Sequence, residues 1–338
     1  MQWSLRRVAS LSEAGADIDR MNDACGGNPL LSSRFLIPII DGAEQPPQRM
    51  LLAGLAAAGE TAPRILTVLA PGRWPCVWET CIRPQAPLGL LWVRPGTDGI
   101  AAMPALLRAL PGAAQLLALI GQDIARLQAR SGPCMTVTPH LTSGAIAVDG
   151  DFETYWNDRP AKYRRNISNR YNRLQRDGKE TRLEVLRAPE DMARAVDEFG
   201  IMESAGWKGR ADTAVHPDNI QGEIYRTIMR SFAETGEALA FRYFIGDELA
   251  STDLALMSAG QLIFLKTTYA EAFSSYAPSQ LMRREIFEMV FREKLANRIE
   301  FFGRVQDRHR ALCTHFWDVG HINIYRWPVL KALHQRLR

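Results

Sequence analysis

Residues 267–287, TTYAEAFSSYAPSQLMRREIF, connect an apolar strand to an amphipathic helix through a turn of small and polar residues that includes Pro278. Two explanations fit these residue types. In a plain turn, Ser279 would cap the helix by accepting a hydrogen bond from a first-turn N–H group. Alternatively, the first N–H groups stay open for an anion, because a helix N-terminus has unpaired donors and a partial positive charge. The residue types alone leave both explanations open.

A second candidate for chemistry is an arginine-dense helix predicted over residues 159–176. An apolar stripe at helical spacing is formed by Tyr163, Ile167, Tyr171 and Leu174. The other face carries the cations Lys162, Arg165 and Arg173, with Arg164 and Arg170 beside them. Such a face is most often solvated. It would also suit a basic wall, and we predict that Arg165 and Arg173 face a cleft or another domain.

Length and composition limit the possible classes of protein. The chain has 338 residues, 46% hydrophobic and 23% charged, which suggests two globular domains. A net charge of +4 argues against a strongly basic nucleic-acid binder, so no DNA partner is expected. The five cysteines form no CxxC pair, and His309, His315 and His321 match no metal-ligand spacing. We therefore expect no metal, reduced thiols and a cytoplasmic location.

Membrane and export signals are also not expected. The first twenty residues have no apolar core of signal-peptide length. The apolar segment LLALIGQDIARL is interrupted by Gln122 and Asp123, too early for a membrane span. The sequence therefore predicts a soluble protein without a transmembrane segment.

Periodicity and turn residues predict a mixed α/β order. In the first half, strands are expected at residues 3–9, 49–59, 64–70, 76–83 and 134–141, with a helix over 101–132 that is interrupted near Pro111. In the second half, the expected order is a strand at 181–187, helices at 189–206 and 219–236, three strands within 237–269, a helix after Ser279, and strands at 297–303 and 321–327. Because the composition changes near residue 150, we predict domains 1–145 and 146–338.

The second-half order is that of the GNAT acyltransferase fold. Four segments in sequence resemble the GNAT branch linked to cellulose and other exopolysaccharide biosynthesis, often called CelD-like. They are FETYWNDRPAKYRRNISNRYNRLQRDG, SAGWKGR, SSYAPSQLM and IEFFGRVQDRHR. The resemblance covers about residues 150–327. The segment GNPLLSSRFL in the first half is similar to the family's entry motif.

The first half resembles a degenerate GNAT-like repeat, as in the distantly similar Fem-type peptidyltransferases. The resemblance thus implies an α/β (α+β mixed sheet) protein of tandem GNAT-like domains, the C-terminal one matching better. Some positions depart from the family pattern. Ser279 replaces a glycine, Phe301 replaces an aspartate with Glu300 one place earlier, and Val305 and Arg310 replace a later glycine and lysine.

A GNAT fold binds coenzyme A where two neighbouring strands separate, with the pyrophosphate at the N-terminus of the following helix. Applied to this sequence, the resemblance implies acetyl-CoA or another acyl-CoA as co-substrate, beside a strand over residues 262–269. The implied coenzyme-binding residues are Tyr276, Ser279, Gln280, Leu281, Arg283 and Arg284. The two arginines would pair with phosphate oxygens.

Acyl transfer also needs a base, a proton donor and an acceptor site. The candidate bases are Asp253, Glu203 and Glu300, and Tyr269 or Tyr276 would protonate the leaving thiolate. In this fold Trp207 and Lys208 would border the acceptor site, and Arg165 is a further candidate for substrate binding. Each of these residues also has a structural alternative, such as a core tyrosine, a surface lysine or a solvent-facing Asp253.

Three functions follow. The first is an acyl-CoA-dependent N- or O-acyltransferase, transferring acetyl or a longer acyl group to a small-molecule or saccharide acceptor of envelope or polysaccharide metabolism. The second is a Fem-like transferase that uses aminoacyl-tRNA, with the arginine-dense helix on the RNA phosphates. The third is a non-catalytic GNAT scaffold in a polysaccharide synthesis complex. The sequence does not identify the acceptor.

Overall fold

The computed structural model describes residues 1–206, 215–301 and 303–336, and the chain divides into two compact units. Unit 1 contains Met1–Ser143 and Trp317–Arg338, and unit 2 contains Gly144–Phe316. The chain passes between the units within strands β7 (Met135–Ala147) and β13 (His315–Tyr325). The end of the expected domain 146–338 is therefore assigned to unit 1.

Unit 1 is a mixed sheet with short helices. Its elements are β1 (Gln2–Val8), α1 (Gly15–Ala24), α2 (Ser33–Ile40), β2 (Met50–Ala56), β3 (Ile65–Pro71), β4 (Val77–Thr80), β5 (Leu91–Val93), α3 (Met103–Ala109), β6 (Leu116–Asp123) and α11 (Pro328–Arg336), with parts of β7 and β13. Strands follow the order β1-β2-β3-β4-β6-β13, and β5 pairs with β3. The core of this unit includes Leu106, Leu117 and Ile322.

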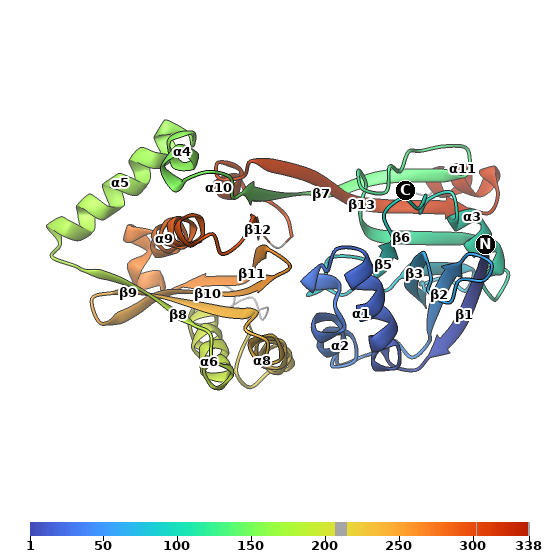
Figure 1. Cartoon of the computed structure of the whole chain (residues 1–338), viewed down its shortest axis with the longest axis horizontal. Coiled ribbons are helices and arrows are strands. Elements are labelled where there is room, and N and C mark those ends of the chain that lie inside the picture. The colour runs from blue at the N-terminus through green and yellow to red at the C-terminus, as the bar shows by residue number, and fades with distance from the viewer. Residues whose placement is uncertain (207–214, 302, 337–338) are drawn as a thin grey trace. The chain divides into compact units, whose positions relative to one another are not determined.

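Unit 2 carries longer helices. Its elements are α4 (Phe152–Asn157), α5 (Ala161–Arg176), β8 (Thr181–Leu186), α6 (Pro189–Ala205), α8 (Ile220–Ala233), β9 (Ala238–Ile245), β10 (Glu248–Ser258), β11 (Gln261–Tyr269), η3 (Glu271–Tyr276), α9 (Pro278–Glu293), β12 (Arg298–Phe301) and α10 (Asp307–Arg310). Strands follow the order β7-β12-β11-β10-β9-β8. Helix α9 lies on one face of β9, β10 and β11, and α6 and α8 lie on the other (Figure 1).

The two units repeat one connectivity. In each, three antiparallel strand pairings are followed by a parallel pair whose strands are joined through a helix. The parallel pairs are β4 with β6 across α3, and β11 with β12 across α9. The expected tandem α/β fold with mixed sheets is thus present. No internal repeat is visible in the sequence, because the repeat is in the pairing of strands and not in residue identities.

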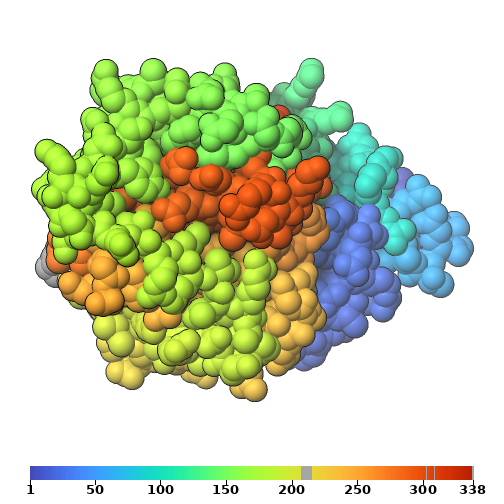
Figure 2. Space-filling model, turned by 60° about the vertical axis from the view of Figure 1, so that its left-hand side comes forward, coloured from blue at the N-terminus to red at the C-terminus, as the bar shows by residue number. Residues whose placement is uncertain are grey.

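Local chemistry explains the elements around α9. Ala259 and Gly260 both have positive φ (50° and 72°), which matches the twist of a two-residue hairpin between β10 and β11. Helix α5 buries Ile167 and Leu174 of the predicted stripe. Figure 2 shows the orange residues of α9 beneath the green residues of α4 and α5. These helices and the sheet enclose one core that includes Phe264 and Phe287.

One expected element is wrong. Residues 101–132 were predicted as an interrupted helix, but only Met103–Ala109 is helical, and Leu116–Asp123 is the strand β6. The run LLALI is apolar at every position, so its periodicity cannot distinguish a buried strand from a buried helix. Its pairing with β4 and β13 makes it a strand. Within the described residues, no helix is long and apolar enough to cross a membrane.

Candidate active site

The parallel strands β11 and β12 of unit 2 separate part-way along their length. Their pairing begins at Gln261 and Arg298 and ends at Phe264 and Phe301. Beyond this point β11 continues to Tyr269 while paired with β10. A cavity of about 720 Å³ opens at the separation, lined by the whole of residues 264–269. We call this place the strand fork.

A β-bulge marks the apex of the strand fork. The register on β10 changes from Leu254 opposite Lys266 to Ala255 opposite Phe264, so Leu265 has no directly opposite residue. A bulge bends its strand and increases the local twist. The bulge lies where β11 diverges from β12, among the residues of β11 that line the cavity.

The N-terminus of α9 forms another wall of the cavity, through Ala277, Pro278, Ser279 and Gln280. The helix begins after Ala277, whose left-handed backbone (φ 54°, ψ 54°) turns the chain, and Pro278 occupies the first helical position. The alternative in which Ser279 caps the helix is therefore excluded. The N-cap residue is Ala277, and the Ser279 hydroxyl instead lies 2.9 Å from the Ser251 hydroxyl.

The expectation of free N–H groups also needs correction. The N–H groups of Gln280 and Leu281 donate to the Ala277 carbonyl at 2.9 and 3.4 Å. Leu281 is completely buried, so its side chain does not contact the cavity. Among described residues, no partner is recorded for the Ser279 N–H. The open donor of this helix end is therefore one residue earlier than predicted.

Two residues assigned to the coenzyme lie elsewhere. Arg284 pairs with Glu288 at 2.9 Å and contacts the ring of Trp156, on the side of α9 that faces α4. The Tyr276 hydroxyl donates to Asp177 at 2.6 Å, and neither residue lines the cavity. Arg284 points away from the cavity because successive helical residues such as Arg283 and Arg284 project about 100° apart.

Arg283 faces inward and lies at the strand fork. Its Nε lies 3.4 Å from an oxygen of Asp253, its Nη1 is 2.6 Å from Nε2 of His309, and its Nη2 donates to the Thr267 hydroxyl at 2.5 Å. The guanidinium carbon also lies 5.3 Å and 5.4 Å from the ring centroids of Phe264 and Phe301. Since Arg283 cannot accept a hydrogen bond, Nε2 of His309 must be the acceptor, which makes this histidine neutral.

Only some of the candidate acid–base residues line the cavity. Glu203 and Tyr269 line the cavity, with Glu203 2% exposed and Tyr269 39% exposed. Asp253 is completely buried on β10 behind Arg283, which argues against direct proton exchange with a substrate. Glu300 lies 3.4 Å from Arg298 and also does not line the cavity. The solvent-facing alternative for Asp253 is therefore wrong, and its role as a base stays a prediction that the pairing with Arg283 argues against.

The predicted acceptor residues receive little structural support. Arg165 is exposed on α5, and no ion pair or hydrogen bond of its side chain is recorded among the described residues. Its predicted orientation toward a cleft is therefore wrong. Arg173 is half-buried and contacts the Ser275 carbonyl at 3.4 Å and the Tyr276 ring. Trp207 and Lys208 lie outside the described residues.

Sequence reasoning missed Arg170 as a site residue. It lines the cavity, and its Nη1 donates to the Ser275 carbonyl at 2.6 Å. Arg170 precedes Arg173 by three residues, so the two share a helix face. That shared face was visible in the sequence, but the turn that it contacts was not. Lys266, Glu271, Arg304 and His309 also line the cavity.

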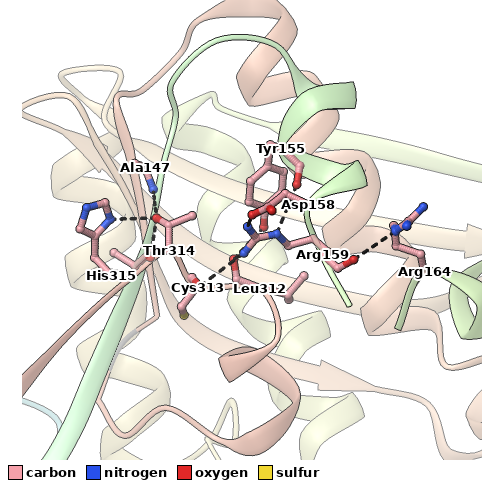
Figure 3. Close-up of polar contacts among 10 residues, drawn as sticks. Ala147, Tyr155, Asp158, Arg159, Arg164, Leu312, Cys313, Thr314 and His315 are labelled. Carbon is pink, nitrogen blue, oxygen red and sulfur yellow. Dashed lines mark hydrogen bonds and ion pairs between the residues drawn. The ribbon is translucent and has the colours of Figure 1, made fainter. Parts of the chain in front are cut away.

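A buried arginine contacts the segment that directly follows the cavity-lining residue His309. Arg159, between α4 and α5, donates to the carbonyls of Leu312 and Cys313 at 3.2 and 3.4 Å (Figure 3). The Tyr155 hydroxyl also donates to the Leu312 carbonyl, at 2.9 Å. The N–H of Leu312 in turn donates to the carbonyl of His309. These contacts connect α4 to the histidine at the strand fork.

The equivalent fork of unit 1 is filled. There β4 and β6 pair through Glu79 and Ala118, after which the Thr80 hydroxyl bonds to both N–H and C=O of Ile120, at 2.8 and 3.1 Å. Gly89 donates to the Gly121 carbonyl, and a side chain at Gly89 would collide with the Ile120 carbonyl oxygen. Protein backbone thus occupies the space that is open in unit 2.

Comparisons with known proteins agree with this geometry. Residues 161–310 match the family model of the acetyltransferase (GNAT) domain. This match supports an acyltransferase. No curated protein matches the chain with significance. In the described part of the chain, no group of three or more His, Cys, Asp or Glu is arranged to hold a metal ion.

Solved structures share the fold at low identity. FemX aligns over 98% of this chain and 100% of its own, with a TM-score of 0.60 and 11% identity. A conserved protein of unknown function from Bacteroides thetaiotaomicron VPI-5482 aligns over 95% and 100%, with a TM-score of 0.56 and 10% identity. L-PGS from Bacillus licheniformis aligns over 95% and 96%, with a TM-score of 0.51 and 13% identity. At such identities the likeness concerns the fold alone.

Proposed function

We propose that unit 2 is an acyl-CoA-dependent N- or O-acyltransferase and that the strand fork binds the coenzyme. The observation that carries the proposal is the open fork itself. Strand β11 loses its parallel partner after Phe264, and the cavity that follows extends to the N-terminus of α9. A GNAT fold binds its coenzyme in this place. The filled fork of unit 1 favours one coenzyme site in this chain.

The chain's residues suit the parts of the coenzyme. Backbone groups of residues 265–269 pair with the pantetheine arm as a further strand would. The Ser279 N–H and the positive end of α9 attract the pyrophosphate. Arg170 and Gln280, both on the cavity wall, supply further donors. Ala277 and Ser279 are small enough for a phosphate to approach the backbone.

The reaction needs one proton transfer in addition to binding. The acceptor nitrogen or oxygen forms a bond to the acyl carbon, the C–S bond breaks, and the sulfur leaves with the bonding electron pair. The proton lost by the acceptor finally reaches that sulfur. We assign Glu203 as the base, since this residue lines the cavity, and Tyr269 as the proton donor to sulfur. The Val215 N–H donates to Glu203 at 2.8 Å and orients the carboxylate.

The proposed class of acceptor rests on the resemblance to the GNAT branch linked to polysaccharide biosynthesis. We propose an amine or hydroxyl of an envelope or polysaccharide precursor, modified in the cytoplasm. Glu203 and Glu271 on the cavity wall would suit a cationic amine, whereas the three basic wall residues Arg170, Lys266 and Arg304 suit the coenzyme. Screening amino sugars against sugar alcohols, with release of free thiol as the signal, would separate N- from O-transfer.

Thermal unfolding with coenzyme tests the proposal. Free CoA at 100 times its dissociation constant should stabilise the chain by about 2.7 kcal/mol. A Ser279→Asp variant should lose much of that stabilisation, because its carboxylate repels the pyrophosphate. Ser168→Asp adds the same charge at an exposed site on α5 and should keep it. No stabilisation of the unsubstituted chain by CoA or acetyl-CoA would refute the coenzyme site.

A second candidate is transfer from aminoacyl-tRNA, as expected for a Fem-like enzyme. Two observations favour it: the alignment with FemX spans both units, and α5 carries six cations, Lys162, Arg164, Arg165, Arg170, Arg173 and Arg176. RNA binding through α5 would weaken steeply with salt, because each neutralised phosphate releases counterions. Salt-dependent binding of aminoacyl-tRNA without any response to CoA would replace the first proposal by this one. No response to either ligand would favour the scaffold.

A further inference from the structure

Arg283 is placed at the apex of the strand fork. It lines the cavity although it is only 7% exposed, and its guanidinium lies beside Phe264 and Phe301, the last residue pair before the strands separate. A thioester whose pantetheine arm lies along residues 265–269, and whose pyrophosphate lies at Ser279, presents its acyl end to this apex. In this placement Arg283 lies beside the reacting part of the co-substrate.

The guanidinium is fixed by three partners on three elements. Asp253 on β10 binds Nε, Thr267 on β11 binds Nη2, and His309 on α10 binds Nη1. Asp253 is completely buried, and it balances the charge of the guanidinium. A group held in this way needs no reorganisation when a ligand arrives, which is the condition for effective electrostatic recognition.

Arg283 retains donors for a ligand. A guanidinium has five N–H groups, and the recorded contacts use one on each nitrogen. Within the part of the chain that the structure describes, one N–H on Nη1 and one on Nη2 therefore remain without a contact. Because its charge is already balanced by Asp253, a neutral acceptor such as a carbonyl oxygen suits these donors better than a second carboxylate does.

Aromatic rings pack against the guanidinium of Arg283. The rings of Phe264 and Phe301 stack with centroids 6.0 Å apart, and Phe301 stacks on His309 at 4.5 Å. Phe287, completely buried, packs edge-on against both phenylalanines. A core packed in this way has no room for additional methylene groups without displacement of side chains.

We propose that Arg283 binds the acyl carbonyl oxygen of the thioester and that the aromatic wall restricts the site to short acyl groups such as acetyl. Asp253, Thr267 and His309 are positioning residues, because each acts through the guanidinium. This inference rests on the proposed function, since it requires the coenzyme to lie in the strand fork. It selects among the acyl groups that the fold alone leaves open.

Isothermal titration with CoA, acetyl-CoA and octanoyl-CoA tests the inference. For the unsubstituted chain, we expect acetyl-CoA to bind about tenfold more tightly than CoA, which corresponds to about 1.4 kcal/mol. Octanoyl-CoA should bind more weakly than acetyl-CoA. In Arg283→Gln the affinities for acetyl-CoA and CoA should become equal, with CoA affinity retained. Arg284→Gln, its neighbour outside the cavity, should keep the tenfold preference.

The outcomes distinguish the inference from the proposed function. No CoA binding by the unsubstituted chain overturns both. CoA binding together with equal losses for CoA and acetyl-CoA in Arg283→Gln overturns the inference alone. Tighter binding of octanoyl-CoA than acetyl-CoA does the same and needs no variant. If Arg283→Gln does not fold, Arg283→Gln with Asp253→Asn removes both charges together and serves as the replacement.

Discussion

Nε of Arg283 lies 3.4 Å from the carboxylate of Asp253, and that carboxylate is completely buried between the sheet and α9. The pair joins the central strand β10 to the helix that begins at the cavity.

Removing one partner of a buried pair leaves an uncompensated charge. Asp253→Ala should therefore lower the free energy of unfolding by about 3–5 kcal/mol, measured by urea denaturation. Glu288→Ala, which breaks the half-exposed pair with Arg284, should change it by less than about 1 kcal/mol. Equal losses of unfolding free energy in Asp253→Ala and Glu288→Ala would show that the buried pair stabilises the fold no more than the half-exposed pair does.

Ser279 provides a second test, because its hydroxyl contacts Ser251 and does not cap the helix. Ser279→Ala should cost about 1 kcal/mol, the value of one hydrogen bond, and leave CoA affinity nearly unchanged. Its backbone N–H, the donor assigned to phosphate, remains in this variant. A large loss of CoA affinity in Ser279→Ala would show that the hydroxyl itself binds the ligand.

Lys294 ends α9 with a left-handed backbone, φ 51° and ψ 42°. A side chain in this region is strained by about 1–2 kcal/mol, and glycine removes that strain at some cost in chain entropy. Lys294→Gly should therefore raise the free energy of unfolding by about 0.5–1 kcal/mol. Urea denaturation is the measurement, and Arg292→Gly, inside the last helical turn, should destabilise by a similar amount. A loss of stability in Lys294→Gly would contradict the left-handed assignment.

Arg159 connects α4 to residues 312 and 313 through its carbonyl contacts. Arg159→Met should lower the free energy of unfolding by about 3 kcal/mol, because the charged hydrogen bonds to both carbonyls are lost and only that of Leu312 keeps a donor, the Tyr155 hydroxyl. Tyr155→Phe removes one neutral bond and should cost about 1 kcal/mol. Exposed Arg176→Met is the control. We also expect weaker acetyl-CoA binding in Arg159→Met, because Leu312 and Cys313 hold the carbonyl of His309.

Burial raises the pKa of the Cys81 thiol from 9.0 to about 11. The folded state therefore retains the proton to a higher pH than the unfolded state does. The stability contributed by the neutral thiol is fully present below pH 9.0 and is lost as the pH rises toward 11. Between these values, the unsubstituted chain should lose at most about 1.4 kcal/mol per pH unit more than Cys81→Ala. Urea denaturation at pH 8 and at pH 10.5 measures the loss for the unsubstituted chain and for Cys81→Ala, with Cys76→Ala as the control. If the free energy of unfolding falls equally with pH in the unsubstituted chain and in Cys81→Ala, the prediction is wrong.

Local residue patterns predicted much of unit 2. The stripe with Ile167 and Leu174 predicted α5, and Pro278 predicted the start of α9, because caps, periodicity and proline geometry act over a few neighbouring residues. The order of these elements was sufficient for the GNAT resemblance. The strand β6 was missed, since an apolar run has the same appearance in a buried strand and in a buried helix.

Sequence by itself thus determined the fold of unit 2 and the turn at which α9 begins. Tertiary structure decided which side chains reach the cavity. Arg283 and Arg284 are neighbours in sequence, yet the helical rotation sends one to Asp253 and the other to Glu288. Asp253, Thr267 and His309 come together only because strand pairing and the fold of α9 bring distant segments to one point. Such long-range contacts depend on packing of the whole unit, which no local pattern of residues specifies.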